Sequence, residues 1–176
     1  MSYMATPPRG SLLYAVEVPQ NAQGASLGPT LFVSTAAAYE ALPPAMQRRL
    51  AGLRAIHRAG AKQYIPGSTL ADAVRDLPDV SHPVVRTHPV TGRKALYVRA
   101  GECVGIVGMA DAEALPLLQE LSDFVTRPAF LYRHTWQVGD LLMWDNCCAQ
   151  HMAVKDYEFP QRRLMYRVTI NGSVPF

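Results

Sequence analysis

Residues 163–170 alternate strictly between two kinds of side chain, which predicts a β-strand with two different faces. One face would carry Arg163, Met165, Arg167 and Thr169, and the other Leu164, Tyr166, Val168 and Ile170. The second face is wholly apolar, so we expect it to pack against another part of the protein. The two arginines of the first face would lie roughly 13 Å apart along the strand.

The mixed face of this strand has two interpretations. Arg163 and Arg167 could be solvated at the surface. If the face instead lines the inside of a barrel, two permanent cations there need anionic partners, because unpaired buried charge is very costly. Their separation suits two anionic groups on either side of a reactive centre, but spacing alone leaves both interpretations open.

The rest of the chain contains many short strand signals. Apolar or alternating runs bounded by turn residues predict strands at 11–18, 30–34, 95–98, 129–136 and 141–144. A turn at Thr91-Gly92 would make 95–98 the returning arm of a hairpin, whereas 59–81 has no regular pattern. Many short strands of this kind favour a mainly β, jelly-roll-like sheet sandwich with helices on its surface.

Helical signals occur in three places. The first is 35–40, with Ser34 or Thr35 as its N-cap. A second, amphipathic helix would begin at Pro43-Pro44, place His57 at its end, and use the apolar positions Met46, Leu50, Leu53 and Ile56. A third would be capped by Asp111, stop before Pro128, and bury the face made by Leu115, Leu118, Leu121 and Val125.

Composition narrows the class of protein. A chain of 176 residues predicts one domain, here 1–176, with 49% hydrophobic residues and a net charge of +3. The basic residues are scattered, which gives little support to nucleic-acid binding, and we expect no membrane segment because no apolar run reaches the required length. The three cysteines, Cys103, Cys147 and Cys148, cannot form a full disulfide set, which favours a reducing cytoplasm, and their spacing argues against structural zinc.

Histidines are the candidate metal ligands. His82 and His88 would lie ~20 Å apart in an extended segment, and each precedes a proline, so we expect structural roles for both. His151 follows Trp144-Asp145-Asn146 and is a candidate ligand, although a lone histidine is more often a hydrogen-bonded structural residue. For Asp145 and Asn146, local hydrogen bonding to the backbone is the favoured interpretation.

Long, ordered motifs cover essentially the whole chain and resemble one family. They are Trp144-Asp145-Asn146-x-x-x-x-His151, Gln161 to Ile170, Thr6-Pro7-Pro8-Arg9-Gly10, His82 to Pro89, and Thr91 to Val98. Together they resemble the TauD/TfdA family of Fe(II)- and 2-oxoglutarate-dependent dioxygenases. The resemblance implies a double-stranded β-helix (jelly-roll, cupin-like), an Fe(II) cofactor, and 2-oxoglutarate and O2 as cosubstrates.

The resemblance also implies roles for individual residues. His151 would be a metal ligand, and Thr30 and Arg163 would hold 2-oxoglutarate. Arg167 would bind the sulfonate or carboxylate of a small anionic substrate, with Tyr3 and Tyr97 as further substrate contacts. The implied reaction is hydroxylation of the substrate with release of succinate and CO2.

One family motif is missing from the sequence. The family's His-x-Asp motif, which supplies the first two metal ligands, would lie immediately before Met1, so we expect an N-terminally truncated domain. The alternative function is therefore a catalytically inactive fragment, or a remnant that survives by forming homo-oligomers. An incomplete barrel exposes edge strands, which favours self-association.

Overall fold

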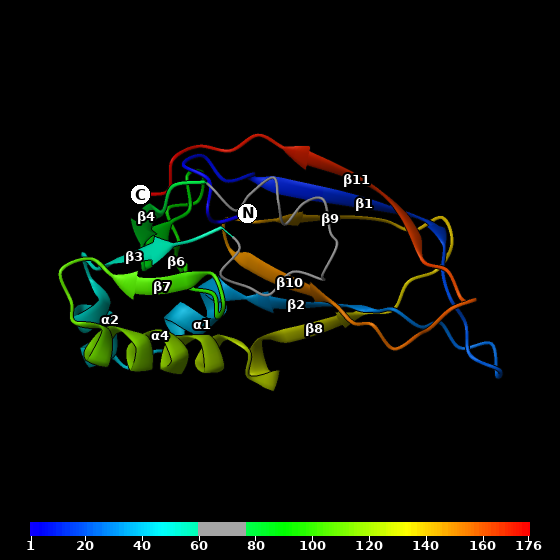
Figure 1. The fold of residues 1–176 in the computed structure, drawn as a ribbon, viewed down its shortest axis with the longest axis horizontal. Helices are drawn as coiled ribbons and strands as arrows, with labels where there is room; N and C mark the ends of the chain where they lie inside the picture. The colour runs from blue at the N-terminus through cyan, green and yellow to red at the C-terminus, as the bar shows by residue number, and fades with distance from the viewer. Residues whose placement is uncertain (60–76) are drawn as a thin grey trace.

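Two antiparallel three-stranded sheets face each other and form the body of the protein. The structure is a computed structural model, and it describes residues 1–59 and 77–176. One sheet has the order β11-β1-β9, from Leu164–Ile170, Gly10–Glu17 and Leu141–Asp145. The other has the order β10-β2-β8, from Ala149–Ala153, Thr30–Ser34 and Leu131–His134. Figure 1 shows the first sheet as the upper layer and the second below it.

Smaller elements extend one end of this sandwich. A third sheet has the order β4-β3-β7, from Val80–Pro83, Arg54–His57 and Cys103–Ile106. The hairpin predicted around Thr91-Gly92 is present, with β5 at Val85–Thr87 and β6 at Lys94–Leu96. Helices α1 (Thr35–Glu40), α2 (Pro44–Leu50) and α4 (Asp111–Val125) lie at this end, and a short 3-10 turn, Pro128–Phe130, leads into β8.

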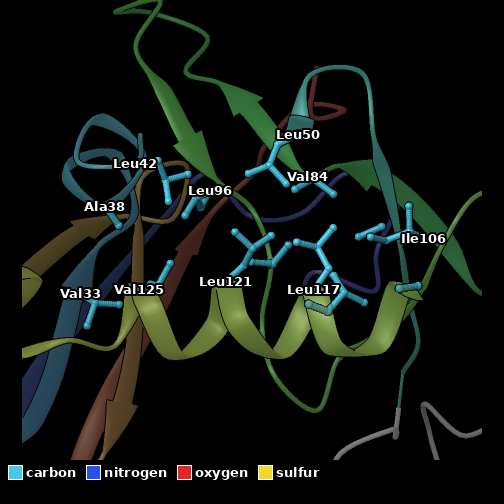
Figure 2. Packing of buried hydrophobic residues seen from close by; sticks show 14 residues of the cluster. Val33, Ala38, Leu42, Leu50, Val84, Leu96, Ile106, Leu117, Leu121 and Val125 are labelled. Carbon is cyan, nitrogen blue, oxygen red and sulfur yellow. The ribbon is translucent and has the colours of Figure 1, made fainter. Parts of the chain in front are cut away.

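The main hydrophobic core packs against one side of α4, at the helical end of the molecule. In Figure 2, Leu117 and Leu121 of α4 point toward three side chains: Leu50 of α2, Ile106 of β7, and Val84, which lies between β4 and β5. All five side chains are buried. This packing holds β7, and with it the turn that precedes β7, at this end of the sandwich.

The mainly β fold with surface helices is confirmed, but the second helix is shorter than predicted. It ends at Leu50, and Arg54–His57 is strand β3, so Ile56 and His57 lie in a sheet. Gly52 adopts a φ of +77°, a left-handed conformation that ends the helix and that glycine adopts without steric cost. Both the helical and the strand period fit the apolar positions here, and pairing of β3 with β4 and β7 decides between them.

Two expected faces were also wrong. In α4, Leu115 is exposed and Leu117 takes its place in the core, and Ala110 occupies the N-cap position ahead of Asp111. In β11, the apolar face that we expected to pack is open to solvent, since Tyr166 and Val168 are both more than 60% exposed. The irregular segment predicted at 59–81 lies mostly outside the described residues.

Candidate active site

A cavity of about 80 Å³ opens beside the inner surfaces of the two large sheets. Its lining includes three residues singled out from the sequence, namely Tyr97, His151 and Arg167. They come from three places: the segment after β6, the middle of β10, and β11. The fold therefore brings these predicted site residues to one place.

His151 lies on the inner face of β10, opposite Phe32 of β2. Its imidazole is 4.6 Å from the ring of Trp144 and 6.1 Å from that of Phe32, measured between centroids. Burial, followed by the nearby charges of Arg99 and Arg167, lowers the pKa of His151 to about 4. The imidazole is therefore neutral at physiological pH, which is the form that binds metal ions.

Thr30 and Arg163 meet although they are far apart in sequence. A guanidinium nitrogen of Arg163, Nη2, donates to Thr30 Oγ1 at 3.2 Å, and the indole Nε1 of Trp136 donates to the same oxygen at 3.0 Å. The Arg163 guanidinium also lies over the Trp136 ring, 5.8 Å from its centroid. Thr30 and Trp136 are fully buried, so this group is fixed by the core of the sheet.

The Arg163 group leaves one donor unused. Arg163 Nε is buried and has no hydrogen-bond partner, and burial lowers the pKa of the guanidinium. Gly28 makes room for it, because a Cβ at that position would lie 2.8 Å from Arg163 Cδ, and its φ of +67° also favours glycine. A partly buried guanidinium with an unsatisfied N–H can bind a carboxylate, whose two oxygens match its planar geometry.

Arg167 lies in β11, which begins directly after Arg163. It lines the cavity and is exposed, and within residues 1–59 and 77–176 it forms no ion pair. Two arginines thus lie at the inner side of this sheet: Arg163, just before β11, in a hydrogen-bonded group, and Arg167, in β11, at the cavity.

Two charged cavity residues were not found from the sequence. Glu102 and Arg99 lie in the turn before β7 and form an ion pair at 2.9 Å. Ser2 Oγ donates to Glu102 Oε2 at 2.6 Å and lies 2.9 Å from Nδ1 of His57, which is also buried. A turn carries no periodicity, and His57 was assigned to the wrong element, so nothing in the sequence pattern indicated this network.

The two predicted tyrosines have different surroundings. Tyr97 lines the cavity, and its ring contacts His57 at a centroid distance of 5.5 Å and the guanidinium of Arg86 at 5.1 Å. Burial raises the pKa of the Tyr97 phenol, which stays protonated. Tyr3 is buried in a small cluster with Ala59 and does not belong to the described lining of the cavity.

A group of possible metal ligands does occur elsewhere, at His88, Asp145 and Cys147. Its hydrogen bonds indicate a structural role. His88 Nδ1 accepts from two backbone N–H groups, so the proton is assigned to Nε2, which donates to Asp145 at 2.9 Å. Asp145 also accepts from the backbone N–H of Cys147, as expected of a residue in a local turn. Burial raises the pKa of the Cys147 thiol to about 11, so this thiol is a poor ligand at neutral pH.

The described residues, 1–59 and 77–176, therefore fit the implied cosubstrate better than they fit the implied metal ion. The Arg163–Thr30 pair, with its unsatisfied N–H, fits a dicarboxylate. His151, His57 and Glu102 all line the cavity, but no three His, Cys, Asp or Glu side chains of the described chain come within ligand distance of one another there. No helix among these residues is long and apolar enough to cross a membrane.

Known dioxygenases resemble this chain in both sequence and fold. The chain is 39% identical over 173 residues to the alpha-ketoglutarate-dependent 2,4-dichlorophenoxyacetate dioxygenase of Burkholderia sp. (strain RASC), an alignment covering 97% of this chain and 56% of the relative. It superimposes on a taurine dioxygenase from Burkholderia xenovorans with a TM-score of 0.83 and 33% identity, over 98% of this chain and 55% of that one. The structure of AAD-2 in complex with Mn(II) and N-oxalylglycine gives a TM-score of 0.84 at 31% identity, covering 99% and 66%.

The chain thus spans little more than half the length of the curated relative and of the taurine dioxygenase. The double-stranded β-helix expected from the motifs is confirmed by these superpositions. The family model named "Taurine catabolism dioxygenase TauD, TfdA family" matches residues 1–169, nearly the entire sequence. With this match and the shared fold, the chain belongs to the TauD/TfdA family.

Proposed function

We propose that this chain carries the cosubstrate and substrate sites of an Fe(II)/2-oxoglutarate-dependent dioxygenase. The reaction would hydroxylate a small anionic substrate and release succinate and CO2. The observation that supports this most strongly is the Arg163–Thr30 pair, in which the partly buried guanidinium has an unsatisfied N–H. The relatives named above act, by their names, on taurine and on 2,4-dichlorophenoxyacetate, which both carry an acidic group.

In this proposal the distal carboxylate of 2-oxoglutarate binds between Arg163 and Thr30. Thr30 Oγ1 already accepts from Arg163 and from Trp136, so its hydroxyl hydrogen is available to donate. Arg163 Nε supplies a second, charge-assisted hydrogen bond. Trp136 is a positioning residue, because its indole holds the Thr30 oxygen in place without contacting the cosubstrate itself.

Arg167 would bind the sulfonate or carboxylate of the substrate at the cavity. Its guanidinium has no ion pair among the described residues, whereas the Arg99 charge is already neutralised by Glu102. Tyr97 would form an apolar wall with a polar tip for the body of the substrate, and Tyr3 remains a further proposed contact. The two arginines would thus bind two anionic groups at separate places.

Fe(II), when bound, supplies the oxygen-activating chemistry, and His151 would be one of its ligands. A facial triad needs two histidines and a carboxylate, and no such group of three meets around His151 among the described residues. A second candidate function is a catalytically inactive fragment. We propose a cytoplasmic location for either form, because all three cysteines are free thiols.

The experiment compares this chain with a version extended at its N-terminus by a His-x-Asp segment. Succinate formation is measured with Fe(II), 2-oxoglutarate and a panel of sulfonates and aryloxy acids. We expect succinate from the extended version, none from its His151→Ala variant, and 2-oxoglutarate binding by both lengths. If neither length binds 2-oxoglutarate, the proposed function is wrong; if both bind but neither forms succinate, the inactive fragment is supported.

A further inference from the structure

The loop that joins β10 to β11, residues 154–163, is tied to the segment that leads into β2. The backbone N–H of Gly28 donates to the carboxylate of Asp156 at 2.6 Å, and Gln161 Nε2 donates to the backbone carbonyl of Gln20 at 2.7 Å. Gly28 and Asp156 are 128 residues apart in the sequence. In Figure 1 both connections lie at the end of the sandwich away from the helices. The fold therefore fixes this loop beside the proposed cosubstrate site.

Tyr157, the residue after Asp156, lies against the side chain of Arg163. A Cβ at Gly28 would lie 2.8 Å from Arg163 Cδ, 3.0 Å from Tyr157 Cε1 and 3.3 Å from Arg163 Nε. The tyrosine ring and the guanidinium thus border the same space, which glycine leaves open. Cε1 is bonded to the ring carbon that carries the hydroxyl, so the hydroxyl end of the ring lies at this space. Burial lowers the pKa of Arg163, and the nearby Tyr157 raises it.

Two hydrogen-bond donors at this place have no partner in the part of the chain that the structure describes. They are the buried Nε of Arg163 and the hydroxyl of the half-buried Tyr157. The neighbouring carboxylate of Asp156 accepts from the Gly28 N–H and lies 3.7 Å from Arg133. It forms no ion pair with Arg163, so an anion at the guanidinium would not compete with it.

The hydroxyl of Tyr157 is not needed for packing. A ring that only covers the stem of Arg163 would serve equally well as phenylalanine. A buried donor without a partner costs free energy, and this cost applies to Arg163 Nε and, in part, to the tyrosine hydroxyl. One acceptor group with several lone pairs, placed between the two donors, removes both costs at once.

We propose that Tyr157 binds the distal carboxylate of 2-oxoglutarate together with Arg163 and Thr30, an inference that rests on the proposed function. The phenol O–H donates to the carboxylate, Arg163 Nε donates a charge-assisted hydrogen bond, and Thr30 donates its hydroxyl hydrogen. An ionised carboxylate accepts about four hydrogen bonds, so it can take all three donors. The bond between Gly28 and Asp156 holds the loop in the position that this contact requires.

Removal of the hydroxyl alone tests the proposal. Tyr157→Phe keeps the ring, and Tyr166→Phe makes the same change on β11, where the side chain is 64% exposed. The Kd of this chain for 2-oxoglutarate is measured by calorimetry in the absence of metal. Loss of one hydrogen bond to a charged group raises Kd about 10-fold or more. We expect this rise for Tyr157→Phe, and a change of less than about twofold for Tyr166→Phe.

Thermal melts without ligand separate binding from packing. The Tyr157 hydroxyl has no partner in the described chain, so Tyr157→Phe should melt within about 2 °C of the wild type. A larger fall in Tm would assign Tyr157 a packing role and overturn the inference. Wild-type affinity in Tyr157→Phe, or an equal loss in Tyr166→Phe, would overturn it while the proposed function stands. If the wild type itself binds no 2-oxoglutarate, the proposed function and this inference both fail.

Discussion

Replacing Arg163 by methionine should abolish most 2-oxoglutarate binding without unfolding the protein. Methionine fills a similar volume but removes the guanidinium, which is partly buried and has an unsatisfied Nε. Truncating one partner of a buried charge pair costs about 3 kcal/mol, or roughly a 150-fold rise in Kd. The free protein gains from losing an unpaired cation and loses one hydrogen bond to Thr30, so its stability should change by only about 1 kcal/mol.

A thermal shift assay separates these two effects. At a 2-oxoglutarate concentration of about 100 times the wild-type Kd, binding stabilises the wild type by roughly 2.7 kcal/mol, which raises Tm by about 5–10 °C. At the same concentration Arg163→Met should gain about 0.3 kcal/mol, or less than about 1 °C. The matched control is Arg162→Met, since Arg162 is exposed and lies near Glu17 at the surface. A full ligand shift in Arg163→Met, or its loss in Arg162→Met, would refute the role of Arg163.

Three further predictions concern the binding loop, the core and the response to acid. Gly28→Ala should lower 2-oxoglutarate affinity, measured by calorimetry, because the new methyl group displaces Arg163 and because φ is +67° at this position. Leu121→Ala should cost about 2–5 kcal/mol of unfolding free energy in denaturant melts, whereas Leu115→Ala, on the exposed side of α4, should cost less than about 1 kcal/mol. Burial and the neighbouring His82 lower the pKa of His57 from 6.5 to about 4, so the unfolded chain takes up this proton first. The stabilising contribution of the neutral His57 is complete above pH 6.5 and falls by about 2–3 kcal/mol as the pH is lowered toward 4, so melts of His57→Gln should show a smaller loss of stability over that range.

Strands with a clear period of two were predictable from the sequence, whereas a segment that fits two periods was not. The alternation in 163–170 gave β11 almost to its ends. Leu50, Leu53 and Ile56 fit a helix as well as they fit a turn followed by a strand, and pairing with distant strands decided for β3. Whether one face of a strand is buried depends on what packs against it. The exposure of the apolar face of β11 therefore could not be predicted from the alternation in its own sequence.

The residues of the candidate site likewise fall into those that the sequence predicted and those that it did not. Thr30, Arg163, Arg167 and His151 were named because a family motif carries them, and the fold places them on inner sheet surfaces. Trp136 was not named, because its role depends on a hydrogen bond to Thr30, 106 residues away. Side chains that act through contacts at such separations leave no local signal in the sequence.

Cosubstrate binding by the Arg163–Thr30 pair is tested most directly by the two tryptophan indoles of the chain. The indole N–H of Trp136 donates to Thr30, and that of Trp144 donates to Asn146, so a ¹⁵N–¹H correlation spectrum contains one reporter at each place. Titration with 2-oxoglutarate, in the absence of metal, should move the Trp136 indole signal saturably and the Trp144 signal much less, with Trp136→Phe giving the assignment. If the Trp136 signal stays in place at millimolar 2-oxoglutarate, the Arg163–Thr30 pair does not bind the cosubstrate.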